Sequence, residues 1–302
     1  MRLTQHLSAA QPLLKRNMSA LWMLVATLFF SIMGASIKLA SAEYSIAEII
    51  FYRSLIGLAI MGIIMRINRC SPSTPNWKMH LNRGIIGVTS MMLSFSAISM
   101  LPLATATTLN YTSSIWIAII LVISPLFRRH QIKPEPRLLI AIAISFIGVI
   151  CLLQPTIRHN QLGGGFIGLL AGITAALAYM TVRELGCRGE PEMRTVFYFS
   201  ATGVVIAGLW MGLLGFHAHT KISILLLGVV GLSATLAQLA LTRAYQFGNT
   251  LVSANFQYAG IIFATIFGMI IWGDHPNPLS WIGMLLIISS GIATTFFRPR
   301  PT

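Results

Sequence analysis

The chain has 302 residues, of which 55% are hydrophobic and only 9% are charged, and its formal net charge is +14. A soluble domain carries roughly 25% charged residues, so this composition excludes a soluble globular protein and indicates a polytopic membrane protein. The basic residues lie in short segments between apolar runs, which is the pattern of membrane topology rather than of a nucleic-acid-binding surface. We therefore expect a lipid bilayer as a partner, and no nucleic acid.

Ten apolar runs are long enough to cross a bilayer, because a hydrocarbon core of about 30 Å needs roughly 17–25 helical residues. In chain order these runs are 19–40, 46–65, 81–100, 103–125, 137–154, 164–183, 195–214, 222–242, 251–272 and 280–297. The sequence therefore predicts an all-α polytopic membrane protein with ten transmembrane helices, preceded by a polar segment at 1–18 and followed by a tail at 298–302.

Lysine and arginine residues give the predicted orientation. Most of the 21 fall on one side of the membrane: in the N-terminal segment, in the loops at 66–83 and 128–137, around the loop after the sixth span, at the end of the eighth span and in the tail. Lys38, Arg158 and Lys221 fall on the other side, and Arg53 lies inside a span. The positive-inside rule then places both termini in the cytoplasm, with the chain in the cell (inner) membrane.

The two halves of the chain resemble each other. FYRS at 51–54 matches FYFS at 197–200, 146 positions later, and Ala97 and Tyr111 match Ala244 and Tyr258 at an offset of 147. Each half holds five spans, an odd number, so the two copies would enter the membrane with opposite polarity. Inverted repeats are typical of secondary transporters, whose site lies where the halves meet. We expect one five-helix repeat at 19–154, a linker at 155–163 and a second repeat at 164–297.

Several of these stretches are similar to a known family. They are FSIMGASIKLA (30–40) followed by EIIFYRSL (48–55), the hairpin AISMLPLATATTLNY (97–111) and its counterpart AYQFGNTLVSANFQY (244–258). The chain resembles a ten-helix, EamA-type member of the drug/metabolite transporter superfamily over nearly all of 19–297. Many members have a proline partway along spans four and nine, which this chain lacks. The resemblance implies transport of a metabolite such as an amino acid, an aromatic compound, S-adenosylmethionine or riboflavin.

Four residues near the outer side form the first candidate site. Arg53 lies in the second span, where an arginine costs about 2.5–3.5 kcal/mol on insertion scales, so it needs a protein partner or a wet cavity. Glu48 is predicted to meet Lys38 across the turn at 41–45 rather than Arg53. The three charges are interpreted either as a structural latch or as a clamp for a substrate carboxylate or phosphate, or an outer gate. Tyr52, next to Arg53, is either an interfacial anchor or part of that gate.

Amides and aromatic residues form the second candidate site. Intramembrane amides hydrogen-bond between helices, so each is interpreted either as inter-helix glue or as part of a cavity lining for a polar organic solute. The candidates are Asn110, Tyr111 and Trp116 in span four, Gln238 in span eight, and Asn255, Gln257 and Tyr258 in span nine.

Glycines recur at every fourth position in two spans. They are Gly164, Gly168 and Gly172 in the sixth span, and Gly208 and Gly212 in the seventh. Such spacing lets helices approach closely. We interpret it as static packing or, alternatively, as a sliding surface used when the halves rock.

Absent motifs narrow the function. The sequence has no phosphate-binding Gly-Lys loop and no HExxH motif, all seven histidines fall outside the predicted spans, and Arg83 is assigned to the loop at 66–83. We expect no cofactor, no metal and no enzymatic activity, and a monomer or weak homo-oligomer. The predicted function is secondary transport of a small organic metabolite, such as an amino acid or an S-adenosylmethionine-like solute, by alternating access. The alternatives are an intramembrane enzyme and a structural or receptor-like membrane protein.

Overall fold

The computed structural model describes residues 2–117, 119–120, 140, 143–144, 147–148, 151, 162–215, 221–247, 253 and 256–296. Regular structure within these ranges is entirely helical. The helices are α1 (Arg2–Ala40), α2 (Ile46–Ile67), α3 (Trp77–Met100), α4 (Leu103–Tyr111), α7 (Leu162–Cys187), α8 (Glu192–Leu214), α9 (Lys221–Phe247), α11 (Ala259–Trp272) and α12 (Pro278–Phe296).

Six of these helices are long and apolar enough to cross a membrane. They are α1 over Ala20–Ala40, α2, α3, α7, α8 over Glu192–Leu213 and α9 over Ile222–Phe247. Shorter apolar helices follow in α11 and α12. The prediction of an all-helical, multi-pass membrane protein is confirmed. Of the fifth predicted span at 137–154, the structure describes only residues 140, 143–144, 147–148 and 151.

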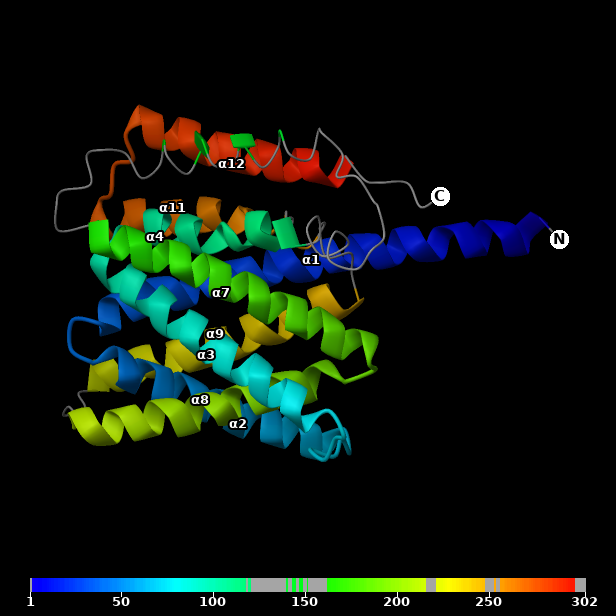
Figure 1. Ribbon diagram of the computed structural model, residues 1–302, viewed down its shortest axis with the longest axis horizontal. Coiled ribbons are helices and arrows are strands. Elements are labelled where there is room, and N and C mark those ends of the chain that lie inside the picture. Colours follow the sequence, from blue (N-terminus) through cyan, green and yellow to red (C-terminus); the bar gives the residue numbers. More distant parts are fainter. Residues whose placement is uncertain are drawn as a thin grey trace.

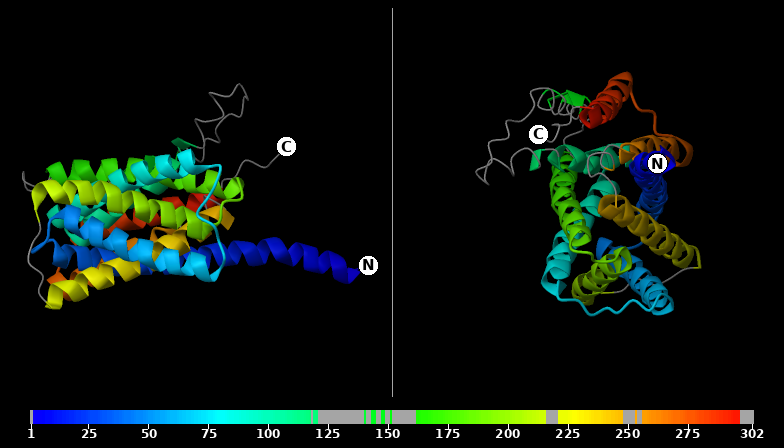
Figure 2. Two further views of the ribbon diagram at one scale, coloured as in Figure 1. Left: turned by 90° about the horizontal axis from the view of Figure 1, so that it is seen from below. Right: turned by 90° about the vertical axis from the view of Figure 1, so that its right-hand side faces the viewer.

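The long helices lie side by side in one bundle (Figure 1), and the right-hand view of Figure 2 looks at the end of this bundle. The amino-terminal part of α1 extends beyond the bundle at the end that also carries the α2–α3 loop and the α7–α8 turn. This arrangement agrees with the predicted topology, in which these three segments share one side of the membrane. The helix α12 lies at the edge of the bundle beside α11, and Thr265 Oγ1 in α11 donates a 3.5 Å hydrogen bond to Met284 Sδ in α12.

The helix α3 begins four residues earlier than predicted. Its N-cap position is Asn76, so His80 and Arg83 belong to the first two turns of the helix. The assignment of Arg83 to a loop and of all histidines to positions outside the spans is therefore wrong. No proline or glycine lies between Pro75 and Arg83, so the helix can begin at Trp77. The side chains of His80 and Arg83 are buried, so the first two turns of α3 lie inside the bundle despite their polar sequence.

Two predicted spans are interrupted at matching positions. Helix α4 ends at Tyr111, Thr112 is a turn residue, and helix resumes at 113. In the second half Gln257 and Tyr258 form a turn directly before α11. Continuous helices over 103–125 and 251–272 were the wrong expectation. Neither interruption contains a proline. At the first one the hydroxyl of Thr112 donates a 2.7 Å hydrogen bond to the Leu109 carbonyl. Where a helix is broken inside a membrane, such a side chain can replace water as the partner of a backbone carbonyl.

The glycines of α7 lie where it packs on the α3–α4 hairpin. A Cβ built at Gly164 would lie 3.1 Å from Leu101 Cγ, and one at Gly168 would lie 2.9 Å from Leu109 Cδ1. Gly208 approaches the Phe51 ring in the same way, whereas nothing lies within 4 Å of a Cβ at Gly212. Four of the five glycines therefore permit close helix approach, and the fifth does not.

Helix contacts occur in matched pairs between the two halves. Helix α1 packs on α9 and α7 on α3, α2 packs on α9 and α8 on α3, and α11 packs on α1 and α4 on α7. At the α2–α8 contact, a Cβ at Gly57 would lie 2.9 Å from Ser200 Oγ, and one at Gly203 would lie 3.0 Å from Ser54 Cβ. Because Ser54 aligns with Ser200 and Gly57 with Gly203 in the sequence repeat, each contact is the counterpart of the other.

Candidate functional site: a cavity with two buried arginines

A cavity of about 110 Å³ lies inside the bundle and is lined by both halves of the chain. Since a water molecule needs only about 10–15 Å³ of such space, the cavity can hold a small solute or several waters. Its lining residues are Phe30, Met33, Gly34, Arg53, Arg83, Gly87, Ser90, Met91, Ser94, Phe95, Ile98, Ala106, Thr107, Asn110, Tyr111, Ala175, Ala178, Tyr179, Phe199 and Gln238.

Two arginines from neighbouring helices meet at one aromatic ring in this cavity. Arg53 on α2 is 5% exposed and Arg83 on α3 is 2% exposed. Their guanidinium carbons lie 4.9 Å and 4.2 Å from the ring centre of Phe199 on α8. The two guanidinium carbons are therefore at most 9.1 Å apart. Phe199 is the residue that aligns with Arg53 in the sequence repeat.

Gly87 makes room for the Arg83 side chain. It lies one helical turn after Arg83, on the same face of α3. A Cβ at this position would clash with Arg83 Nη1 and would lie 2.8 Å from Phe199 Cε2. The absence of a side chain at Gly87 thus allows the guanidinium group to lie along the helix and against the ring.

Neither arginine has a counter-ion among the described residues, and Arg53 Nε, Arg83 Nε and Arg83 Nη1 have no hydrogen-bond partner there. A desolvated cation–π contact contributes about 2 kcal/mol, whereas burying an ion costs several kcal/mol even after relaxation. Phe199 alone therefore does not compensate the burial of the two charges.

Four residues of the predicted sites lie on this cavity: Arg53, Asn110, Tyr111 and Gln238. Asn110 Nδ2 donates a hydrogen bond to Ser94 Oγ, which holds its amide at the cavity wall. Tyr111 packs against α11, where a Cβ at Gly260 would collide with its ring. Asn110 and Tyr111 therefore lie in the wall of the cavity on its α3–α4 side.

The predicted cluster of Lys38, Glu48 and Arg53 is not formed, which corrects the latch interpretation. Lys38 Nζ donates to the Leu101 carbonyl at 3.1 Å and lies 4.9 Å from the ring centre of Trp272. Glu48 closes a capping box at the start of α2, because its Oε2 accepts from the Ser45 amide at 3.0 Å. Sequence separation alone could not distinguish a cross-turn ion pair from a helix cap.

The remaining candidates lie in the packed interior. Tyr52 is half-buried against the hydrophobic core, and Trp116 packs against a second cluster that includes Met23 and Tyr245. Gln257 is buried, and its Oε1 accepts from Tyr245 at 3.3 Å and from Ser114 at 3.4 Å, so it acts as inter-helix glue. Tyr258 is a buried core residue, and Asn255 lies outside the described residues.

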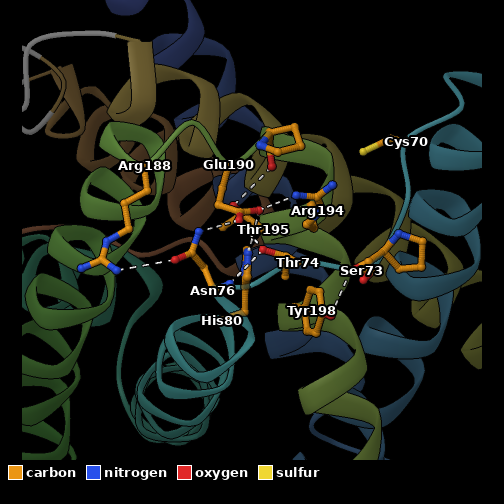
Figure 3. Close-up of polar contacts among 12 residues, drawn as sticks. Cys70, Ser73, Thr74, Asn76, His80, Arg188, Glu190, Arg194, Thr195 and Tyr198 are labelled. Atoms are coloured by element: carbon orange, nitrogen blue, oxygen red, sulfur yellow. Dashed lines mark hydrogen bonds and ion pairs between the residues drawn. The ribbon is translucent and has the colours of Figure 1, made fainter.

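A second polar cluster, the Glu190 junction, joins the α2–α3 loop to the α7–α8 turn (Figure 3). Glu190, whose side chain is 4% exposed, accepts from Thr74 and from Asn76 Nδ2 at 2.8 Å, both in the α2–α3 loop. Arg194 Nη1 donates to it at 2.7 Å, and His80 Nε2 lies 3.2 Å away. Burial would raise the pKa of Glu190, but these four hydrogen bonds outweigh it and lower that pKa to about 2.

Comparison with known proteins agrees with this architecture. The model of the EamA-like transporter family matches residues 17–154 and again residues 162–296. The pseudopaline exporter of Pseudomonas aeruginosa is 30% identical over 271 residues, 89% of this chain and 93% of the relative. An uncharacterized transporter of Helicobacter pylori is 29% identical over 280 residues, 89% and 91% of the two chains. A solved crystal structure with 16% identity covers 93% of this chain and 97% of its own, with a TM-score of 0.69, which shows a shared fold. The chain therefore belongs to the EamA-like transporter family.

Proposed function

We propose that the protein is a secondary transporter of a small organic metabolite, such as an amino acid or an S-adenosylmethionine-like solute, and that the cavity is its solute site. The observation that carries the proposal is that the cavity is lined by Arg53, Arg83 and Asn110 from one half and by Tyr179, Phe199 and Gln238 from the other. A site between two halves is accessible from alternate sides when the halves rock.

The two halves are proposed to be inverted five-helix repeats at 19–154 and 164–297, giving ten transmembrane helices joined by a linker at 155–163. The paired helix contacts and the reciprocal Ser54–Gly203 and Gly57–Ser200 contacts support this arrangement, since a pseudo-two-fold axis generates such pairs. The matching interruptions near Tyr111 and Tyr258 support it further. In the proposed orientation, both termini are cytoplasmic and the chain lies in the inner membrane.

Reconstituted protein tests the transport proposal. We expect proteoliposomes containing the full chain to show saturable flux of at least one of L-glutamate, L-tryptophan, S-adenosylmethionine and riboflavin, without added ATP, because the sequence has no phosphate-binding Gly-Lys loop. Protein-free liposomes provide the background. Flux indistinguishable from that background for all four solutes would contradict the proposal.

Alternating access requires the Glu190 junction to separate, and a cross-link tests this requirement. Asn76 Oδ1 lies 3.5 Å from Arg188 Nη1 across the two loops. In a background with Cys70, Cys151 and Cys187 changed to serine, we expect a cleavable thiol cross-linker between Asn76→Cys and Arg188→Cys to reduce flux at least about tenfold, and reduction to restore it. The two single-cysteine variants are the controls, and unchanged flux in the cross-linked protein would rule out separation at this junction.

A further inference from the structure

The charges in the cavity lack a protein counter-ion because the acidic residues of the described chain lie elsewhere. The chain has seven Asp and Glu residues. Glu190, Glu192 and Glu184 pair with Arg194, Arg243 and Arg188 outside the cavity, respectively. Glu48 caps α2, Asp274 follows α11, Glu43 lies in the α1–α2 turn, and Glu135 falls outside the described residues. The cavity lining contains both arginines and no described acid.

We infer that Arg53 and Arg83 form a two-armed anion site in which the carboxylate or phosphate group of the transported solute binds between two guanidinium groups. The inference rests on the proposed transport function and names the class of solute that the cavity selects. Buried charges are otherwise paired or hydrogen-bonded in proteins, and unpaired ones mark ligand sites.

The geometry suits a single anionic group, or two closely spaced ones, on one solute. Both guanidinium groups line the same cavity, and their carbons are at most 9.1 Å apart because they lie 4.9 Å and 4.2 Å from one ring centre, so they are within reach of one small molecule. Each guanidinium presents five N–H donors in a planar fork that matches carboxylate and phosphate oxygens, and three of the nitrogen atoms have no partner among the described residues. The apolar part of the lining, including Phe30, Met33 and Phe95, lowers the local dielectric constant and so strengthens the attraction.

Gly87 is the positioning residue of this site. A methyl group there would clash with Arg83 Nη1, so Gly87→Ala moves one guanidinium while leaving both charges in the protein. Gly62 on α2 has nothing within 4 Å of an added Cβ and is the matched control. A role for Arg83 in packing alone gives no reason for anion binding to depend on Gly87.

Binding to the purified full-length protein, read as a rise in melting temperature, tests the inference. The probes are succinate, citrate and inorganic phosphate, with succinamide as the uncharged analogue of succinate. We expect at least one anion to stabilise the wild type where succinamide does not, and Arg53→Gln, Arg83→Gln and Gly87→Ala each to weaken its apparent affinity at least about tenfold. Two controls should leave the affinity for the anion unchanged: Arg66→Gln, which removes an exposed charge, and Gly62→Ala. The carboxylate and phosphate arms identify which group is preferred.

Stability without added anion gives a second measurement. If the two arginines form an anion site, their buried charges repel each other when no anion is bound. Arg83→Gln then relieves this repulsion and raises the melting temperature of the anion-free protein. The inference is overturned if no anion stabilises the wild type more than succinamide, or if the variants lose stability and keep full anion affinity.

Flux separates this inference from the transport proposal. Arginine-dependent anion binding without flux in proteoliposomes would leave the anion site standing and remove the transport function. Flux that persists unchanged in Arg53→Gln and Arg83→Gln, with no anion response in the wild type, would leave a transporter and overturn the anion site.

Discussion

The Glu190→Gln variant is expected to melt at a temperature lower by roughly 5–10 °C than the wild type. The substitution removes the charge that four side chains contact, and it presents an amide N–H₂ to the donors of Arg194 and Asn76. Removing one partner from a buried ionic network destabilises by about 3 kcal/mol. Differential scanning fluorimetry of the purified protein measures the shift.

The matched control is Glu184→Gln, a few residues earlier. Glu184 pairs with Arg188 at 3.1 Å, but the two side chains are 54% and 52% exposed. An exposed pair of this kind contributes at most about 1 kcal/mol, so the melting temperature should change little. Equal shifts in the two variants would show that the Glu190 junction is no more stabilising than a surface pair.

Acidification should weaken the Glu190 junction in the wild type. The folded protein lowers the pKa of Glu190 from about 4.5 to about 2, so its contribution to stability is fully present above about pH 4.5 and is lost as the pH falls toward 2. The difference in melting temperature between wild type and Glu190→Gln is therefore expected to narrow from pH 6 to pH 3. A difference that stays constant over this range would contradict the assignment.

Gly172→Ala is expected to destabilise the protein by about 2 kcal/mol, against the usual helical preference for alanine. A Cβ at Gly172 would clash with Thr112 Oγ1 and would lie 2.8 Å from the Leu109 carbonyl oxygen, at the interruption that ends α4. Because a backbone oxygen cannot rotate away, α7 must move off α4. The measurement is the melting temperature, with flux as a second readout.

Gly212→Ala is the control for Gly172→Ala, since it adds the same methyl group to an apolar helix at a position with nothing within 4 Å. Alanine is favoured over glycine in a helix by up to about 1 kcal/mol, so this variant should be neutral or slightly more stable. Opposite signs for the two variants are the expected result. A neutral Gly172→Ala would show that the α4–α7 contact relaxes easily.

The helices themselves were largely predictable. The second span was expected at 46–65 and α2 covers Ile46–Ile67, because bilayer thickness fixes the length of an apolar run. Arg53 was also identifiable as a candidate site residue, since one arginine in an apolar helix requires an explanation.

Arg83 was not predictable, because its local sequence resembles the basic loop before it. It lies in the second turn of α3, close to Lys78 and Arg69 in sequence, and it is buried against Phe199 of α8. Contacts between residues more than a hundred positions apart leave no local pattern. The one signal available was the unbroken sequence after Asn76, which permits an earlier helix start.

The helix interruptions were missed for a related reason. Neither Thr112 nor Gln257 is a strong helix breaker, and the turn at Gln257 is stabilised by partners elsewhere in the chain. Gln257, for example, accepts hydrogen bonds from Tyr245 and Ser114. At the second interruption Ser31 Oγ in α1 also donates to the Gly260 carbonyl at 3.2 Å, so this interruption depends on side chains from other helices of the assembled bundle.

The α2–α8 contact has a mechanical consequence in the proposed inverted-repeat arrangement. Swapping the two halves exchanges the Ser54–Gly203 contact with the Gly57–Ser200 contact, so the point midway between them lies near the axis that relates the halves. If the transporter changes state by exchanging the shapes of its halves, displacement is smallest on that axis and grows with distance from it. The α2–α8 contact is then the pivot of the motion. Its glycine and serine residues allow the two helices to rotate against each other without repacking of large side chains. The Glu190 junction lies at the end of the same two helices, where the same rotation produces a larger displacement than at the contact itself.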